Sequence, residues 1–313
     1  MAKLRVRSLA DAPFGAVVTG LDACAISGAD RDVIWQAYRE RHGLLCFVFD
    51  RPLHAAELHA LTAVFGESEF APGLINGIGK RPPPGEENRT VDEQVAALRA
   101  NGEDPYLTFL GNVDRHMLVK KERPPEFFGE WEWHTDMSYI EVPPTFSLLH
   151  ARQVPSRGGD TWFCSQVMAA AGLTGELRRR IIGRTIKHDS TYGSSGLLRP
   201  GMTPPPSPVE AIGQSHPILR IVPSTGEEAL FLGRRTNGYV NGLPLAESEA
   251  LLDELWAHAT RPEFVYRHAW TPGEVVVWDN RMLLHKRDPF DPAEIRLMWR
   301  TQTKGEPVVA ASR

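Results

Sequence analysis

The chain has 313 residues, a formal net charge of −4 and a pI near 6.3. A general nucleic-acid-binding protein would carry a basic face, so we expect no nucleic-acid partner. Three widely separated cysteines, with no C-x-x-C pair, argue against a disulfide framework or a zinc ribbon and fit reduced thiols. The sequence has neither a secretory signal nor an apolar run long enough to cross a bilayer, so we expect a cytoplasmic location and no membrane partner.

The N-terminal part mixes strand and helix patterns. We expect a short strand within 14–22, a helix at 30–43 with Asp30 as its N-cap, a buried strand at 44–50 and a second helix at 53–66. The segment at about 73–104 is polar, contains three consecutive prolines and has one helical patch over 91–99. We interpret it as a surface insertion that is either a lid over a site or without function.

From residue 106 onward, short strand patterns dominate and are separated by Gly and Pro. We expect them at 106–113, 130–140, 145–154, 160–165, 216–222, 227–233, 264–270, 273–279 and 295–302, with helices at 169–185 and 246–261. This order predicts one mainly β domain over 1–313 with flanking helices and a jelly-roll core. A regular parallel α/β sheet is disfavoured because strands and helices do not alternate.

The stretch "EWEWHTDMSY" holds the first candidate site residues. If it forms a strand, His134 and Asp136 point to the same side, because side chains alternate along a strand. Such a pair is either part of a metal site or a hydrogen-bonded surface pair. His285, after an apolar strand and a "DNR" turn, would complete a set of two histidines and one carboxylate. That set binds three positions of Fe(II) and leaves three open.

Arg296 and Arg300 follow His285 within "RLMWRTQ", where a strand would place both on one face. Two guanidinium groups inside a barrel need anionic partners. They either receive a carboxylate ligand, which the planar guanidinium grips through two hydrogen bonds, or they form structural ion pairs. The candidate structural partners are Asp288, Asp291 and Glu294.

The order of "WHTDMSY", "SRGGDTWF", "WDNRMLLH" and "RLMWRTQ" resembles the taurine dioxygenase and 2,4-dichlorophenoxyacetate dioxygenase (TauD/TfdA) family, and the likeness runs from about Gly15 to Gln302. These proteins are Fe(II)- and 2-oxoglutarate-dependent oxygenases on a double-stranded β-helix. The resemblance therefore implies a dioxygenase that uses O2 to hydroxylate a C–H bond and produces succinate and CO2. Members of the family are commonly dimers or tetramers, so it also implies a homo-oligomer.

The resemblance also assigns roles. The iron ligands would be His134, Asp136 and His285. Thr161 and Arg296 would bind the distal carboxylate of 2-oxoglutarate, and Arg300 would lie near the substrate or the other end of the cosubstrate. The supporting residues would be Trp133, Asp279 and Asn280.

The sequence departs from the taurine enzyme at the substrate. That enzyme has an "IHP" segment, whereas the matching "FGESEFAPG" has Phe70 and no histidine. Together with Trp131, Trp133 and Tyr139, Phe70 favours a small organic acid with an apolar or aromatic body, although such residues are more often core. The candidates are an aryloxyalkanoate, an alkyl sulfonate or sulfate ester, and a biosynthetic intermediate.

Two readings from other classes stay open at this point. The three ligands could hold Zn(II) in a cupin-like hydrolase, where the metal would activate water. The chain could also be a non-catalytic jelly-roll binding protein, because fold does not dictate function.

Overall fold

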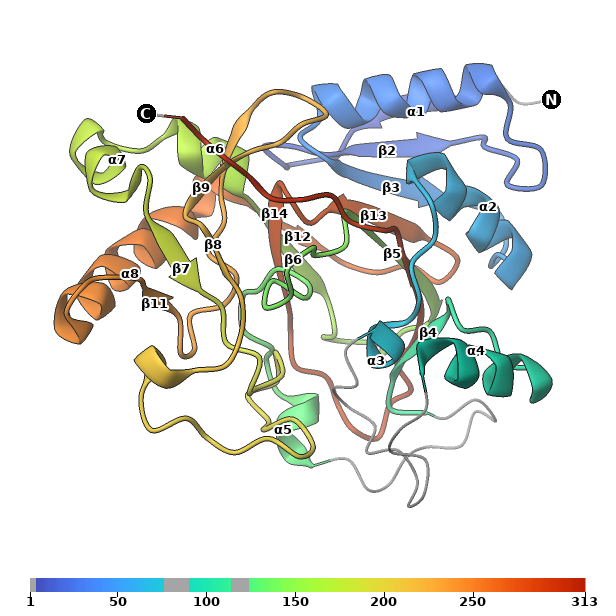
Figure 1. Cartoon of the computed structure of the whole chain (residues 1–313). Helices are drawn as coiled ribbons and strands as arrows, with labels where there is room; N and C mark the ends of the chain where they lie inside the picture. Colours follow the sequence, from blue (N-terminus) through green and yellow to red (C-terminus); the bar gives the residue numbers. More distant parts are fainter. Residues whose placement is uncertain (1–3, 76–89, 114–123, 313) are drawn as a thin grey trace.

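The computed structural model describes residues 4–75, 90–113 and 124–312 (Figure 1). Within them the helices are α1 (Gly28–Glu40), α2 (Ala55–Phe65), α3 (Pro72–Ile75), α4 (Val91–Ala100), α5 (Pro125–Phe128), α6 (Gln166–Ala171), α7 (Gly175–Ile181) and α8 (Leu245–Ala259). Helix α1 begins one turn earlier than expected. Ser27 is its N-cap, and Asp30 completes a capping box by accepting from the Ser27 backbone N–H.

The largest sheet has seven strands in the order β1-β2-β3-β13-β5-β15-β4. Their bounds are β1 (Arg5–Ser8), β2 (Ala16–Thr19), β3 (Leu44–Val48), β13 (Val275–Asp279), β5 (Phe146–Gln153), β15 (Leu297–Gln302) and β4 (Thr108–Gly111). Only the β2–β3 pair is parallel among these described strands, and the other neighbours are antiparallel. A regular parallel sheet is therefore absent from the described residues, as the sequence predicts.

Three smaller sheets complete the β structure. The one that matters for the site has the order β12-β6-β14, with bounds β12 (Val265–His268), β6 (Thr161–Ser165) and β14 (Leu283–Arg287). The other two are β10-β9-β16 and β11-β7-β8, with bounds β7 (Thr185–Lys187), β8 (Ser215–Pro217), β9 (Leu219–Ile221), β10 (Glu228–Leu230), β11 (Tyr239–Val240) and β16 (Val309–Ala310). The structure combines these sheets with flanking helices, and the mainly β class stays a prediction. The double-stranded β-helix stays a prediction.

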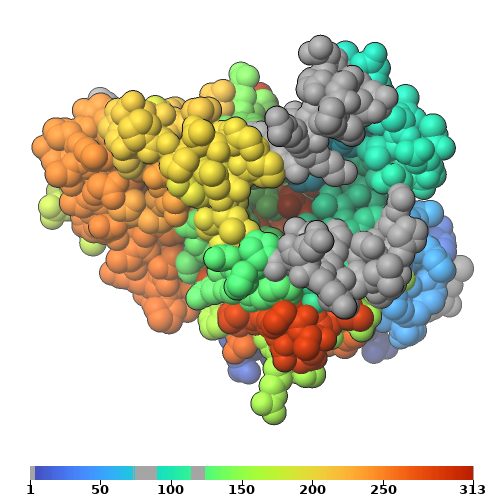
Figure 2. All heavy atoms as spheres, turned by 90° about the horizontal axis from the view of Figure 1, so that it is seen from below, coloured from blue at the N-terminus to red at the C-terminus, as the bar shows by residue number. Residues whose placement is uncertain are grey.

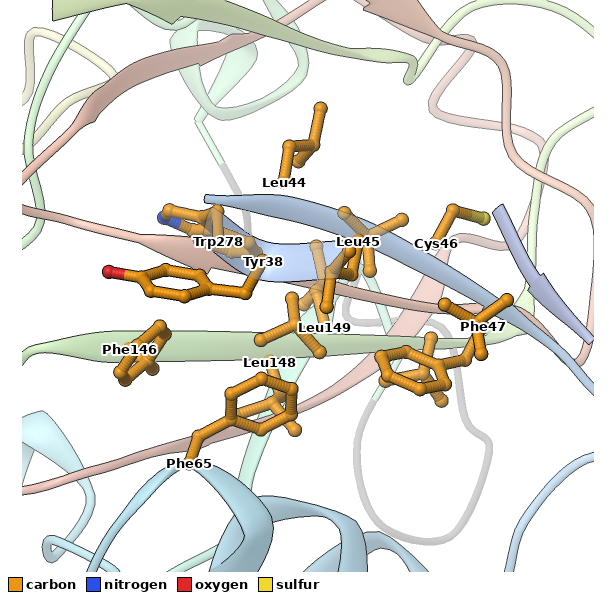
Figure 3. Close-up of a cluster of buried hydrophobic side chains, with 14 of the residues drawn as sticks. Tyr38, Leu44, Leu45, Cys46, Phe47, Phe65, Phe146, Leu148, Leu149 and Trp278 are labelled. Carbon is orange, nitrogen blue, oxygen red and sulfur yellow. The ribbon is translucent and has the colours of Figure 1, made fainter. Parts of the chain in front are cut away.

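Helices α1 and α2 cover one face of the seven-stranded sheet. Phe65 of α2 packs against Phe47 of β3 and Phe146 of β5, with ring centroids 6.3 Å and 5.2 Å away, and all three side chains are buried (Figure 3). Burying one such aromatic side chain stabilises a fold by roughly 1.5–3 kcal/mol. This apolar layer fixes the position of the sheet whose opposite face carries the site.

The opposite face of the large sheet packs against the β12-β6-β14 sheet. Phe163 of β6 meets Trp278 of β13 with ring centroids 5.5 Å apart. The register of the small sheet places His285 and Tyr266 on either side of Phe163. Residues directly opposite one another in a sheet share a face, so these side chains point into the same space between the sheets.

The insertion expected at about 73–104 lies partly outside the described residues. Within the described part, α4 confirms the helical patch, and Thr90 caps it in the same way that Ser27 caps α1. The lid function stays a prediction.

Candidate active site

His134 and His285 face each other across a short antiparallel bridge. Each backbone N–H donates to the other residue's carbonyl at 2.9 Å. A pair that exchanges both hydrogen bonds sets its side chains on one face, and the two imidazole centroids are 4.1 Å apart. Both residues are buried. Two nitrogen ligands are thus fixed by backbone pairing.

The strand expected over 130–140 is wrong. Only His134 makes a ladder contact there, and the chain then turns over 136–139 with Met137 at a φ of 51°. The pattern misled because two isolated bridges at His134, to Arg234 and to His285, replace a continuous ladder. His134 and Asp136 still converge, because the turn carries the carboxylate back toward the imidazoles.

The two oxygens of Asp136 have different surroundings. Oδ1 lies 4.0 Å from His134 Nε2 and 3.7 Å from His285 Nε2. Oδ2 accepts a hydrogen bond from Ser147 at 2.8 Å and lies 3.0 Å from Arg300 Nη2. One ligand atom from each of the three residues lies within 4.8 Å of the others. The carboxylate therefore offers Oδ1 to a shared ligand while Oδ2 is held from behind.

The protonation states of these groups suit a metal. Burial lowers the pKa of His285 to about 4 and that of His134 well below its usual value. Burial opposes ionisation of Asp136, but Arg300 and the two imidazoles outweigh it and lower its pKa to about 2. Two neutral imidazoles and one carboxylate are therefore present at neutral pH. This donor set fits a divalent cation such as Fe(II).

A second layer of hydrogen bonds supports the carboxylate. Asn280 Nδ2 donates to Ser147 Oγ at 3.0 Å, and Asn280 Oδ1 accepts from Trp278 Nε1 at 3.0 Å. Ser147 in turn holds Asp136. On the histidine side, His134 Nδ1 lies 2.8 Å from the Glu132 carbonyl oxygen, which leaves Nε2 to face Asp136. Asp279, the other expected supporting residue, pairs with Arg281 and lies outside this chain of contacts.

The three residues border a cavity of about 210 Å³ that also contacts the two expected arginines and Thr161. Its lining includes Phe109, Leu110, Phe127, Trp131, His134, Asp136, Leu149, Thr161, Trp278, His285, Lys286, Arg287, Arg296 and Arg300. Strand β4 and helix α5 contribute to it, and both lie at the lower end in Figure 1. Seen from below in Figure 2, this end is hollowed between a yellow segment near residue 205 and a teal segment near residue 105.

Arg296 is buried at the cavity wall without a carboxylate partner among the described residues. Its Nε donates to the Gly159 carbonyl at 3.3 Å, and burial lowers its pKa to about 10. The structural ion pairs considered for it do not form. Asp288 instead pairs with Arg267 at 3.1 Å, and Glu294 accepts from Ser156. The charge of Arg296 is left for a ligand.

Arg287 is a second buried cation in this wall, and the sequence analysis missed it. It ends β14 directly opposite Thr161 of β6. Its Nη2 donates to the Phe127 and Gly129 carbonyls, and its guanidinium lies 4.4 Å from the Trp131 ring centroid. Burial, followed by the neighbouring Arg296, lowers its pKa. The signal was present in "HKR", because Arg287 follows His285 by two positions in a strand and so shares its face.

Thr161 lies between these arginines and the loop after β12. Its hydroxyl oxygen accepts a hydrogen bond from Trp270 Nε1 at 3.0 Å. Thr161 is buried and borders the cavity together with Arg287 and Arg296. One hydroxyl and two guanidinium groups thus meet at the end of the cavity away from Asp136.

Arg300 sits nearer the triad than Arg296 does. Besides its contact with Asp136, Nη2 donates to Gln302 at 2.9 Å. Of the expected substrate residues, Arg300 and Trp131 line the cavity, whereas the other three aromatic residues do not. Phe70 stacks on Tyr106 with centroids 4.9 Å apart, Tyr139 accepts from Arg199, and Trp133 packs against the core beside Lys286. Their role in substrate binding stays a prediction.

Comparisons with known proteins agree with one another. The sequence profile described as "Taurine catabolism dioxygenase TauD, TfdA family" matches residues 5–302. The chain is 30% identical over 311 residues to an (S)-phenoxypropionate/alpha-ketoglutarate-dioxygenase of Sphingobium herbicidovorans, covering 95% of this chain and 94% of that protein. It is 34% identical over 216 residues to an alpha-ketoglutarate-dependent 2,4-dichlorophenoxyacetate dioxygenase of Cupriavidus pinatubonensis, covering 65% and 71%.

A solved structure is similar over nearly the whole length. AAD-2, crystallised in complex with Mn(II) and N-oxalylglycine, has a TM-score of 0.74 and 25% sequence identity, and the match covers 97% of this chain and 100% of that one. Among the described residues, no helix is long and apolar enough to span a membrane.

Proposed function

The chain belongs to the TauD/TfdA family of alpha-ketoglutarate-dependent dioxygenases, and from that premise we propose that it is an Fe(II)-dependent member that hydroxylates a C–H bond of a small organic acid. The products are succinate, CO2 and the hydroxylated acid. One observation supports this proposal above the others: the cavity has two neutral imidazoles and a carboxylate at one end, and at the other two buried arginines that pair with no carboxylate of the described residues.

In this proposal His134, Asp136 and His285 hold the iron. Bound iron, with 2-oxoglutarate, supplies the oxidising power for the attack on the C–H bond. The residues contribute geometry. The bridge between the two histidines fixes both imidazoles, and Ser147 with Arg300 fixes Asp136 Oδ2, so that Oδ1 faces the metal position. A ligand set held in this way needs little rearrangement when the ion binds.

Arg296 and Thr161 bind the distal carboxylate of 2-oxoglutarate. A carboxylate suits this end because it accepts hydrogen bonds from a guanidinium and a hydroxyl at once. Arg287 adds a second positive charge opposite Thr161. Arg300, beside Asp136, lies where the other end of the cosubstrate or the anionic group of the substrate would come.

The substrate is an acid with an apolar or aromatic body, and we favour an aryloxyalkanoate. Phe109, Leu110, Phe127, Trp131 and Leu149 form apolar walls of the cavity. Aromatic walls bind aryl groups by offset or edge-to-face packing. The two relatives named for phenoxypropionate and 2,4-dichlorophenoxyacetate support this choice. One relative is named as an alpha-ketoglutarate-dependent sulfate ester dioxygenase, so an alkyl sulfate is included among the acids to be tested. The cytoplasmic location and the homo-oligomer remain predictions.

The test begins with metal-free protein under anaerobic conditions. Fe(II) and then 2-oxoglutarate are added while the visible spectrum is recorded. We expect a weak charge-transfer band that needs both additions. Asp136→Ala should lose it, whereas Asp32→Ala, at an exposed position of α1, should keep it. Folded, iron-loaded wild type without the band would contradict the iron and 2-oxoglutarate assignment.

The substrate class is tested next in the same samples. We expect (R)- or (S)-2-phenoxypropionate or 2,4-dichlorophenoxyacetate to perturb the band and, once oxygen is admitted, to raise succinate formation above the rate without substrate. Taurine and an alkyl sulfate serve as comparison acids. Stronger stimulation by either of these than by every aryloxy acid would overturn the aryloxyalkanoate choice.

A further inference from the structure

A second cluster of potential metal ligands lies between the same two sheets. It consists of Cys46 on β3, His268 at the end of β12 and Glu274 just before β13. One ligand atom from each residue lies within 4.8 Å of the others. Cys46 and His268 are buried, and the Glu274 side chain is 14% exposed. None of the three lines the cavity of the first site.

Strand register explains why these three residues meet. Cys46 pairs directly with Val276 on β13, so Glu274, two positions before Val276, projects to the same side. His268 pairs with Thr161, which borders the cavity from the inner face of the small sheet. Figure 3 shows Cys46 on the side of β3 opposite Phe65, which is the side toward the small sheet. The cluster thus joins the facing surfaces of both sheets.

His268 provides an independent observation. The residue is 4% exposed, and its Nε2 is buried with no hydrogen-bond partner in the described part of the chain, although Glu274 Oε2 lies 3.2 Å away. The distance permits an ion pair, but the angles do not give a hydrogen bond. Leaving a buried polar atom unsatisfied costs about 1–3 kcal/mol. Nε2 therefore lies beside the carboxylate without forming a hydrogen bond to it.

Residues outside the cluster also contact His268 and Glu274. His268 Nδ1 lies 3.2 Å from the Tyr266 hydroxyl, and Glu274 Oε2 accepts from the Thr271 backbone N–H at 3.0 Å. Metal-binding histidines commonly use their second nitrogen in such a contact, which orients the ring. Ring orientation and carboxylate position are thus both set by neighbours.

We propose that Cys46, His268 and Glu274 form a second metal site that binds Zn(II) through three protein ligands and leaves the fourth position to water. Sulfur, nitrogen and oxygen donors together suit zinc, which accepts all three, whereas the first site lacks sulfur. Binding converts the Cys46 thiol to a thiolate and releases its proton to solvent. Thiolate and carboxylate then balance the two charges of the ion, so the filled site is neutral overall, as a buried site requires. The bound ion would tie β3 and β13 to β12.

The experiment uses Co(II) as a spectroscopic probe in chelator-treated, reduced, full-length protein. Only a thiolate ligand gives the intense near-ultraviolet sulfur-to-cobalt band, and the first site has no sulfur. We expect one equivalent of thiolate-bound Co(II) in the wild type, and Zn(II) added in excess over both sites should bleach the band. Asp136→Ala should keep the band, which separates this inference from the proposed catalytic function. A folded wild-type protein without the band would overturn the inference.

Four variants identify the ligands. Cys46→Ser should abolish the band, whereas Cys24→Ser, at the exposed cysteine, and Cys164→Ser, at the other buried one, should retain it. His268→Gln serves as a second ligand variant, in case Cys46→Ser does not fold, and should shift or remove the band. Persistence of the full band in Cys46→Ser or in His268→Gln would contradict the assignment.

Discussion

The two three-residue clusters flank the same strand, β6, yet they differ in chemistry. His285 on β14 and His268 on β12 both project from the inner face of the small sheet. The first cluster has only nitrogen and oxygen donors and borders a cavity, whereas the second includes a thiol and lies outside that cavity. Sheet geometry brings ligands together in both places. Donor type and adjoining space then distinguish the two clusters: only the first borders this cavity, and only the second includes sulfur.

The largest predicted effect is on succinate formation, and it comes from a change in the first cluster alone. Asp136→Ala removes the only carboxylate of the first cluster, so we expect succinate formation to fall at least about a thousandfold, because the metal loses a ligand and its charge balance. Succinate release is measured with the aryloxy acid that most strongly perturbs the charge-transfer band of the protein with Fe(II) and 2-oxoglutarate. Full turnover of this variant without added formate or halide would contradict the ligand assignment.

A second effect concerns the arginine end of the cavity. Arg296→Gln leaves a carboxylate without its guanidinium partner, which costs about 2 kcal/mol or more, so we expect the KM for 2-oxoglutarate to rise roughly 30-fold. Arg287→Gln should raise it less, because its guanidinium is already engaged by two carbonyls. Steady-state kinetics measure both. Arg179→Gln, at an exposed position, is the control and should leave the KM unchanged.

A third prediction tests the support behind the first cluster. Ser147→Ala removes the hydrogen bond to Asp136 Oδ2, so Fe(II) affinity should fall about tenfold, as is common when such a supporting contact is lost. The Co(II)–thiolate band of the second cluster should be unchanged in this variant. Equal weakening of both clusters would mean that Ser147 supports the fold generally instead of the carboxylate.

The smallest effect is a pH dependence of the metal-free protein. His285 has a pKa lowered from 6.5 to about 4 by burial. Between these values the unfolded chain binds a proton that the folded chain does not, so stability falls as the pH is lowered through this window. Between pH 6.5 and 5.5 the contribution of His285 to the free energy of unfolding should fall by about 1 kcal/mol. Urea unfolding of wild type and His285→Gln measures it, and identical pH slopes would contradict the prediction.

The sequence predicted the first cluster far better than the second. The motif order selected His134, Asp136 and His285, and the structure brings them together, although Asp136 arrives through a turn and not along a strand. Arg287 was missed even though its spacing from His285 carried the necessary information. The cluster of Cys46 was not visible, because its residues come from distant strands whose pairing register cannot be read from a single sequence.

The fold was predicted with the same unevenness: helices set by neighbouring residues were predicted well, whereas pairings between distant strands were not. Helices α1, α2, α4 and α8 appear close to their expected positions, because hydrophobic spacing and capping residues act over a few positions. Which strands become neighbours, such as β13 between β3 and β5, depends on contacts between distant parts of the chain. Those contacts determine where a cavity forms, and with it which aromatic residues can meet a substrate.

The hydrogen bond from Trp270 to Thr161 fixes the direction in which that threonine can interact. An indole N–H can only donate, so the hydroxyl oxygen is the acceptor in this bond and its single proton is left for another partner. A ligand end that only accepts, as a carboxylate does, can take that proton while the indole bond stays in place. The ring of Trp270 also touches that of His268, with centroids 4.6 Å apart. The same indole therefore orients the Thr161 hydroxyl and connects it physically to the second cluster.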